Sequence, residues 1–119
     1  MQVDKLVIAG STVGEDGTRV LKLSGPMVIT NLFEFQDAVR AETSPLLILD
    51  LTEVPYMDSA ALGSVVSAHI SCVNGKRRLA LAGVTDRVAT LMKVTNVHRV
   101  LPMYSTVADA ISAYGPPAP

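Results

Sequence analysis

The chain has 119 residues, and its ten Lys and Arg against eleven Asp and Glu give a formal net charge of −1. This length allows one domain, and the balanced charge excludes the broad basic surface of a nucleic-acid-binding protein. Hydrophobic residues make up 49% of the chain but aromatic residues only 4%, so we expect an aliphatic core. The longest purely aliphatic run, residues 46–49, is far shorter than the ~20 apolar residues of a membrane-spanning helix, so we expect no membrane association.

Cysteine usage and the first residues bear on the compartment. Cys72 is the only cysteine, so neither an internal disulfide nor a cysteine-rich zinc site is expected. Residues 1–5 lack the charged and apolar regions of a signal peptide. We therefore expect a cytoplasmic protein without a metal or cofactor.

The first half of the chain predicts two strands, a helix and a third strand. Residues 3–9 and 19–23 are β-prone and separated by turn signals, which is typical of a hairpin. A helix is expected from Thr30 or Asn31 to Ser44-Pro45, with Asn31 and Glu34 at capping-box spacing. Residues 46–51 are almost wholly apolar, which indicates a strand buried on both faces.

The second half predicts a long helix and then alternating short elements. After a loop over 52–58, a helix is expected to begin near Asp58-Ser59 and to end at Asn74-Gly75. Its predicted buried stripe comprises Leu62, Val65, Val66, His69, Ile70 and Val73. There follow a strand at 78–82, a helix from Thr85 or Asp86, a strand at 99–101 and a helix from Ser105 or Thr106 to Tyr114. Residues 1–114 are expected to form one domain and 115–119 a disordered tail.

The predicted order ββαβαβαβα indicates an α/β fold with a small, mostly parallel or mixed sheet and about four helices. Functional residues in such folds gather beyond the carboxyl ends of the strands. The turn between the buried strand at 46–51 and the helix at Asp58-Ser59 is therefore the first place to look.

Ser59 combines three features of a modification site. It follows a buried strand, it lies at a helix start where free N–H groups favour an anion, and its neighbours Ala60, Ala61 and Gly63 are small. A phosphoryl group there would add about −1.5 to −2 charges beside Asp58. Ser and Asp are also favoured helix N-caps, so the residues alone leave a capping role open as well.

The stretch from 47 to 63, which contains Asp58-Ser59-Ala60-Ala61-Leu62-Gly63, resembles the STAS domain of bacterial anti-sigma-factor antagonists. In that family an aliphatic strand leads into a segment like D-S-[ST]-G-L-G. Residues 79–84 and 104–111 also resemble the sequence pattern of the family, so the likeness covers roughly residues 3–113. The resemblance implies that an anti-sigma factor, acting as a serine kinase, phosphorylates Ser59. Because Ala60 replaces a second hydroxyl residue, Ser59 would be the only acceptor in the motif.

Other functions fit the residues less well. A hydrolase would need a G-x-S-x-G elbow, which is absent, and we expect His69 and His98 to be structural. A response-regulator receiver could use Asp50 as acceptor, but residues 25–28 offer no acidic cluster for magnesium. No phosphate-binding glycine motif is present, and only the family resemblance keeps nucleotide binding as a minor alternative. We therefore expect a binding protein and not an enzyme.

The resemblance implies a regulatory cycle. The dephosphorylated chain would bind an anti-sigma factor and release the sigma factor, phosphorylation at Ser59 would prevent docking, and a phosphatase would restore it. The alternative is a scaffold subunit that forms a homo-oligomer or assembles with other STAS proteins, with Ser59 only a cap. The expected partner-binding residues are Val54, Tyr56, Met57, Asp58, Ser59, Ala60 and Leu62, with residues 54–57 as exposed surface.

Overall fold

The computed structural model describes residues 5–14 and 16–114, so the expected tail at 115–119 and the outer limits of the domain lie outside the described residues. In chain order the elements are β1 (Val7–Val13), β2 (Thr18–Ser24), the 3-10 turn η1 (Ile29–Asn31), α1 (Leu32–Arg40), β3 (Leu46–Glu53), α2 (Ser59–Asn74), β4 (Arg78–Ala82), α3 (Asp86–Val94), the 3-10 turn η2 (Val97–Arg99), β5 (Met103–Tyr104) and α4 (Val107–Tyr114).

The five strands form one sheet in the order β1-β2-β3-β4-β5. Only β1 and β2 pair antiparallel, and every later pairing is parallel. The predicted α/β class with a mixed sheet and four helices is therefore confirmed. Parallel neighbours need crossover connections, and the helices α1, α2 and α3 supply them.

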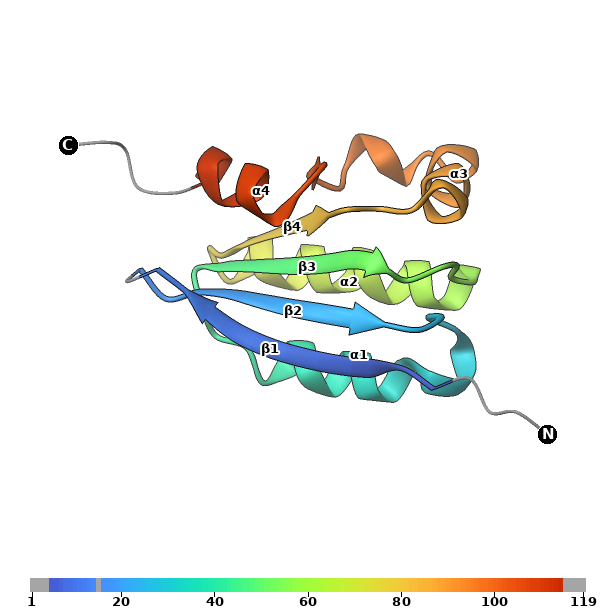
Figure 1. Ribbon diagram of the computed structural model, residues 1–119, viewed down its shortest axis with the longest axis horizontal. Helices are drawn as coiled ribbons and strands as arrows, with labels where there is room; N and C mark the ends of the chain where they lie inside the picture. Colours follow the sequence, from blue (N-terminus) through green and yellow to red (C-terminus); the bar gives the residue numbers. More distant parts are fainter. Residues whose placement is uncertain (1–4, 15, 115–119) are drawn as a thin grey trace.

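The helices cover both faces of the sheet unequally. Figure 1 shows α1 and α2 side by side behind the sheet, with α4 near the opposite edge from β1. Along β3, Leu47, Leu49 and Leu51 belong to the core cluster that includes residues of α1, α2 and α3. Leu46 and Ile48 instead pack in the smaller cluster with α4. No helix in the described part of the chain is long and apolar enough to span a membrane.

The buried face of α2 differs from the predicted stripe. Its buried residues are Ala61, Leu62, Val65, Ala68 and Cys72. Ile70 and Val73 are instead 52% and 55% exposed, and Val66 and His69 are half-buried. Small side chains let a helix approach its neighbour closely, so the face with three small residues packs on the sheet and the longer ones are displaced to the flank.

The end of the first strand and the role of one predicted cap also differ from the sequence prediction. Residues 3 and 4 of the strand predicted at 3–9 lie outside the described residues. The described strand runs over Val7–Val13 and ends later than predicted, because the turn comes only at Gly14 and Gly17, whose φ values are 72° and 82°. Asn31 stands at the N-cap position of α1, as predicted, but its side chain makes no cap hydrogen bond. Its side-chain oxygen accepts a hydrogen bond from Val28 N (3.0 Å) and its amide donates to Pro26 O (2.9 Å), which fixes the preceding loop instead.

The strand predicted at 99–101 was wrong. Asn96 adopts the left-handed conformation with φ 67° after α3, and the chain continues in the 3-10 turn η2. Leu101 then enters the core at 3% exposure. The strand β5 forms only beyond Pro102, where Met103 and Tyr104 pair with β4.

Replacing Gly25 or Gly63 by alanine should change the stability of the fold in opposite directions. Gly25 has a φ of 112°, and a Cβ there would collide with the main-chain oxygen of Lys5, whereas a Cβ at Gly63 meets no atom within 4 Å. We expect Gly25→Ala to lower the free energy of unfolding by about 1–3 kcal/mol. Gly63→Ala should raise it by about 0.5–1 kcal/mol, because alanine favours the helix. Urea unfolding measures both, and equal effects of the two changes would contradict this explanation.

Candidate functional site

The connection from β3 to α2 is fixed at its first residues. The N–H of Val54 donates to Leu51 O (3.0 Å), and the Thr85 hydroxyl, just before α3, donates to Val54 O (2.7 Å). The side chain of Val54 is fully buried. The loop therefore leaves the sheet in a direction set by both β3 and the start of α3.

The second half of this loop lies beside the segment that follows β2. Met27 N donates to Tyr56 O and Asp58 N donates to Met27 O, each at 3.1 Å, which forms an isolated parallel bridge between Met27 and Met57. Met27 is fully buried and Met57 is 7% exposed. This bridge brings the beginnings of η1 and α2 together.

Asp58 joins the two helical segments through its carboxylate. One oxygen, Oδ1, accepts from Ala61 N at 2.8 Å and so caps α2. The other, Oδ2, accepts from Ile29 N at 2.9 Å, at the start of η1. Asp58, and not Ser59, is therefore the N-cap. Ser59 is the first helical residue and is exposed.

A cation lies over the aromatic ring of the loop. The guanidinium of Arg87, in the first turn of α3, is 4.9 Å from the centre of the Tyr56 ring. Such stacking favours one orientation of the ring. Tyr56 is half-buried, so part of its ring remains accessible.

The predicted partner-binding residues divide into two groups. Val54, Met57 and Leu62 are 0%, 7% and 3% exposed, so the expectation that 54–57 is exposed surface was wrong for Val54 and Met57. Both are hydrophobic anchors that hold the loop to the core. The accessible members are Tyr56, Asp58, Ser59 and Ala60.

Two hydrophobic residues near this loop escaped the sequence prediction. Ile29, whose N–H binds Asp58, is 65% exposed, and Phe33 in the first turn of α1 is 74% exposed. The exposure of Phe33 could have been predicted from the sequence, because Phe33 lies outside the helical spacing of the apolar residues Leu32, Phe35 and Val39. Together, Ile29 and Phe33 leave two large apolar side chains exposed in one short segment, which makes this segment a candidate contact surface.

The arrangement offers a hydroxyl acceptor and no adjacent histidine. His69 lies ten residues further along α2, about 15 Å along its axis, and His98 Nδ1 lies 3.4 Å from Met92 O. Among residues 5–14 and 16–114, no group of three or more His, Cys, Asp or Glu could hold a metal ion. Asp50 binds its own strand end, accepting from Thr52 N and Oγ1 at 3.1 and 2.8 Å.

Comparisons with known proteins agree on one family. A model of the STAS domain matches residues 11–110. An anti-sigma-B factor antagonist of Listeria monocytogenes is 39% identical over 56 residues, which are 47% of this chain and 49% of that protein. The match to this curated relative thus spans about half of its length.

Solved structures show the same fold at lower identity. An anti-sigma factor antagonist from Mycobacterium paratuberculosis has a TM-score of 0.80 at 19% identity, covering 92% of this chain and 93% of that one. Unphosphorylated SpoIIAA, also an anti-sigma factor antagonist, has a TM-score of 0.73 at 14% identity, covering 94% and 100%. The Bacillus cell fate determinant SpoIIAA in its phosphorylated form has a TM-score of 0.68 at 14% identity, covering 90% and 98%.

The cap provides a direct test of the site geometry. Asp58→Ala removes acceptors for both Ala61 N and Ile29 N, so we expect a loss of about 1–2 kcal/mol in the free energy of unfolding. Asp58→Asn should lose less, because asparagine is also a good N-cap. Urea unfolding gives the energies and amide hydrogen exchange follows the two N–H groups. Unchanged exchange at Ile29 in Asp58→Ala would contradict the bridging role.

Proposed function

Because the chain belongs to the STAS domain family, we propose that it is an anti-sigma-factor antagonist whose docking on an anti-sigma factor is switched off by phosphorylation of Ser59. The observation that carries the proposal is the exposed Ser59 hydroxyl at the start of α2, beside an Asp58 carboxylate that already caps the helix. Relatives named as antagonists support the binding role, and SpoIIAA has a phosphorylated form.

Electrostatics explains why the modification would act as a switch. A phosphoryl group on Ser59 places about −1.5 to −2 charges next to the carboxylate of Asp58. Free N–H groups in the first turn of α2 reduce the cost in the free chain. At an interface without a cation opposite, burying that dianion is strongly unfavourable, and each ~1.4 kcal/mol lowers the affinity tenfold.

The cycle that follows is reversible. The dephosphorylated chain binds the anti-sigma factor in the bacterial cytoplasm and frees the sigma factor for transcription. The anti-sigma factor, acting as a serine kinase with ATP, transfers a phosphoryl group to the Ser59 oxygen and ends the complex. A phosphatase hydrolyses the phosphoserine and restores binding. The chain itself carries out no chemistry in this cycle.

The docking surface combines predicted and newly found residues. Around Ser59 we place the accessible Tyr56, Asp58 and Ala60 together with the exposed apolar side chains of Ile29 and Phe33. Hydrophobic contact next to the hydroxyl supplies affinity, while the hydroxyl supplies the control. The buried residues Val54, Met57 and Leu62 position this surface without forming part of it.

Substitutions at Ser59 test the switch. We expect Ser59→Asp to weaken binding to the anti-sigma factor of the source organism by about tenfold or more, because it adds a charge next to Asp58. Ser59→Ala should bind as tightly as the unmodified chain. Isothermal titration calorimetry measures both affinities.

Ser112→Asp, a change at an exposed serine of α4, controls for the added charge alone and should bind normally. Equal affinity of Ser59→Asp and Ser59→Ala would overturn the switch. If neither variant nor the unmodified chain bound an anti-sigma factor, the antagonist function itself would be wrong.

Phe33 tests the apolar part of the surface. Phe33→Ala should weaken binding by about 1–3 kcal/mol, as expected for an aromatic contact residue. Because Phe33 is 74% exposed, the free energy of unfolding should change little. Val94→Ala on α3, at 79% exposure, is the matched control. Parallel calorimetry and urea unfolding separate the two effects, and normal binding by Phe33→Ala would remove α1 from the interface.

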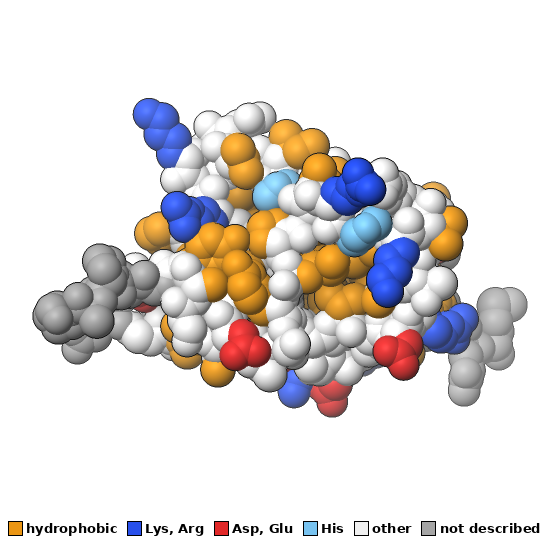
Figure 2. Space-filling model, turned by 90° about the horizontal axis from the view of Figure 1, so that it is seen from above, with side chains coloured by type: hydrophobic (Ala, Val, Ile, Leu, Met, Phe, Trp, Pro, Cys, Tyr) orange, Lys and Arg blue, Asp and Glu red, His pale blue; other side chains and the backbone are white. Residues whose placement is uncertain are grey.

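A scaffold role is the second candidate, and one observation favours it. Ile70, Val73 and Val100 are 52%, 55% and 56% exposed, and they line a hollow of 350 Å³ with Val66, His69 and Asn74. Figure 2 shows hydrophobic side chains gathered beside the histidines on this side of the molecule. If the chain assembles through this patch, sedimentation velocity would show larger species with and without the Ser59 changes. A monomer at high concentration argues against the scaffold.

A further inference from the structure

A groove runs between α1 and α2 on the side of the sheet that carries both helices. Its volume is 310 Å³, which falls at the lower end of small-molecule sites. Phe35, Val39 and Ala68 provide apolar walls, and Ser67 and Ser71 add hydroxyl groups along α2. Gln36 of α1 and Ser64 of α2 also line the groove and are hydrogen-bonded to each other at 3.0 Å. Both helices therefore contribute apolar and polar side chains to the lining.

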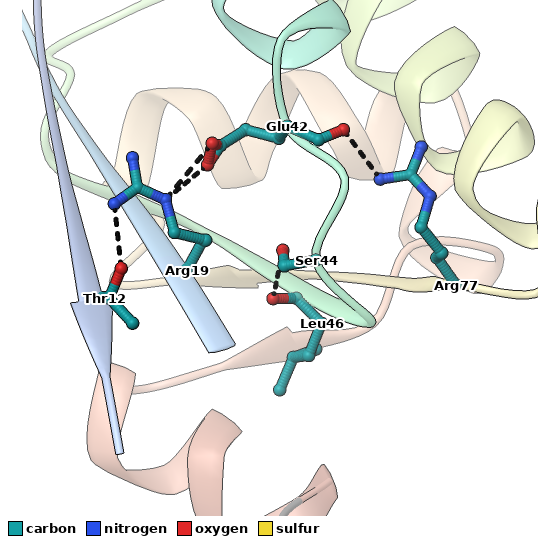
Figure 3. A network of polar contacts seen from close by, with 6 residues as sticks. All are labelled: Thr12, Arg19, Glu42, Ser44, Leu46 and Arg77. Carbon is teal, nitrogen blue, oxygen red and sulfur yellow. Dashed lines mark hydrogen bonds and ion pairs between the residues drawn. The ribbon is translucent and has the colours of Figure 1, made fainter. Parts of the chain in front are cut away.

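Arg77 lines this groove and carries a positive charge. Its side chain is half-buried, and Nη1 donates to the main-chain oxygen of Glu42 at 3.0 Å (Figure 3). The Glu42 carboxylate is already occupied, because it accepts from Arg19 Nε at 2.6 and 3.2 Å. In the part of the chain that the structure describes, no ion pair includes Arg77.

A second arginine lies at the same end of the groove. The helices α1 and α2 run in the same direction (Figure 1), and Arg40 closes α1 where Arg77 follows α2. Arg40 pairs with Asp37 at 3.2 Å, but these side chains are 72% and 73% exposed, so this pair is weak. Among the residues that the structure describes, no Asp or Glu lines the groove.

Cys72 also lines the groove, and its thiol adds no negative charge that would repel an anion. Its side chain is fully buried. Burial raises the pKa of the Cys72 thiol, although the nearby Arg77 acts in the opposite direction. The thiol therefore stays protonated and neutral near pH 7, and contributes an apolar surface.

From these contacts we propose that the α1–α2 groove binds a small amphipathic anion, a carboxylate or phosphate ester that carries an apolar group. The headgroup lies against the planar guanidinium groups of Arg77 and Arg40, which bind both carboxylate and phosphate oxygens. The apolar group lies on Phe35, Val39 and Ala68. The headgroup end of the groove, at Arg40 and Arg77, lies at the far end of α2 from Ser59, since the 16 residues of the helix extend over about 24 Å. The proposed headgroup position is therefore separate from the proposed switch.

Octanoate is a suitable probe, with octanol and inorganic phosphate as its separated halves. We expect octanoate to cause saturable changes in the ¹H–¹⁵N amide spectrum of the full chain at Val39, Ser67, Ser71 and Arg77. Octanol and phosphate should each bind about tenfold or more weakly, because each lacks one of the two contacts.

Matched variants on exposed positions locate the site without unfolding the chain. Arg40→Gln should weaken octanoate binding several-fold, about 3- to 10-fold, while Arg99→Gln on η2 should not. Ser67→Phe should fill the groove and abolish binding, whereas Ser112→Phe on α4 should leave it intact.

Three results would overturn the proposal. One is the absence of saturable octanoate shifts in the groove. Another is binding of octanol as tight as that of octanoate, which would show that hydrophobic contact alone accounts for the affinity. The third is a set of shifts confined to the separate hollow at Ile70, Val73 and Val100.

Discussion

The burial of β3 on both faces is the constraint on which the rest of the molecule depends. Its residues from Leu46 to Leu49, with Leu51, are at most 5% exposed, and their main-chain groups are paired with β2 and β4. Because helices cover both faces of β3, the chain becomes accessible only beyond the carboxyl end of this strand. The chain therefore emerges at one edge, where Asp58 immediately fixes the beginning of α2.

Two hydrogen bonds from main-chain N–H groups to the Asp58 carboxylate fix the shape of the surface beyond the end of β3. Since Asp58 binds both Ala61 N and Ile29 N, the start of α2 and the turn into α1 are positioned together. Ser59 then presents its hydroxyl from a rigid helix end, with exposed Ile29 and Phe33 in the adjoining segment. Rigid presentation suits a site where one added charge has to change an interface.

The long helix α2 serves several surfaces at once because it contains no Lys, Arg, Asp or Glu. Small residues on its inner face bring it close to the sheet. One flank of α2 forms a wall of the groove shared with α1, and Arg77 lines this groove. The other flank exposes Ile70 and Val73. A helix with charged flanks could not border two such hollows without changing their chemistry.

The sequence predicted the parts of the fold that depend on strong local patterns. The apolar run of β3, the alternation of elements and the start of α2 at Asp58-Ser59 were recognised correctly. The buried face of α2 was recognised only at Leu62 and Val65, because a hydropathy pattern ranks Ile70 above Ala68 although close packing favours the small residue. The position of β5 depends on pairing with β4, which no local pattern contains.

The site was predicted only in part for a related reason. Ser59 and Asp58 stand out by their place in the chain. Ile29 joins them only through a tertiary hydrogen bond to Asp58, and Val54 and Met57 are buried by contacts distant in sequence. Exposure depends on such contacts, so the sequence prediction placed the buried Val54, Met57 and Leu62 on the surface together with accessible residues.

Incubation of the purified chain with ATP and the serine kinases of its source organism, followed by mass spectrometry, tests the central claim most directly. A single phosphoryl group on Ser59 is the predicted result. An active kinase that leaves Ser59 unmodified, or modifies another residue of the chain instead, would contradict a switch at the start of α2.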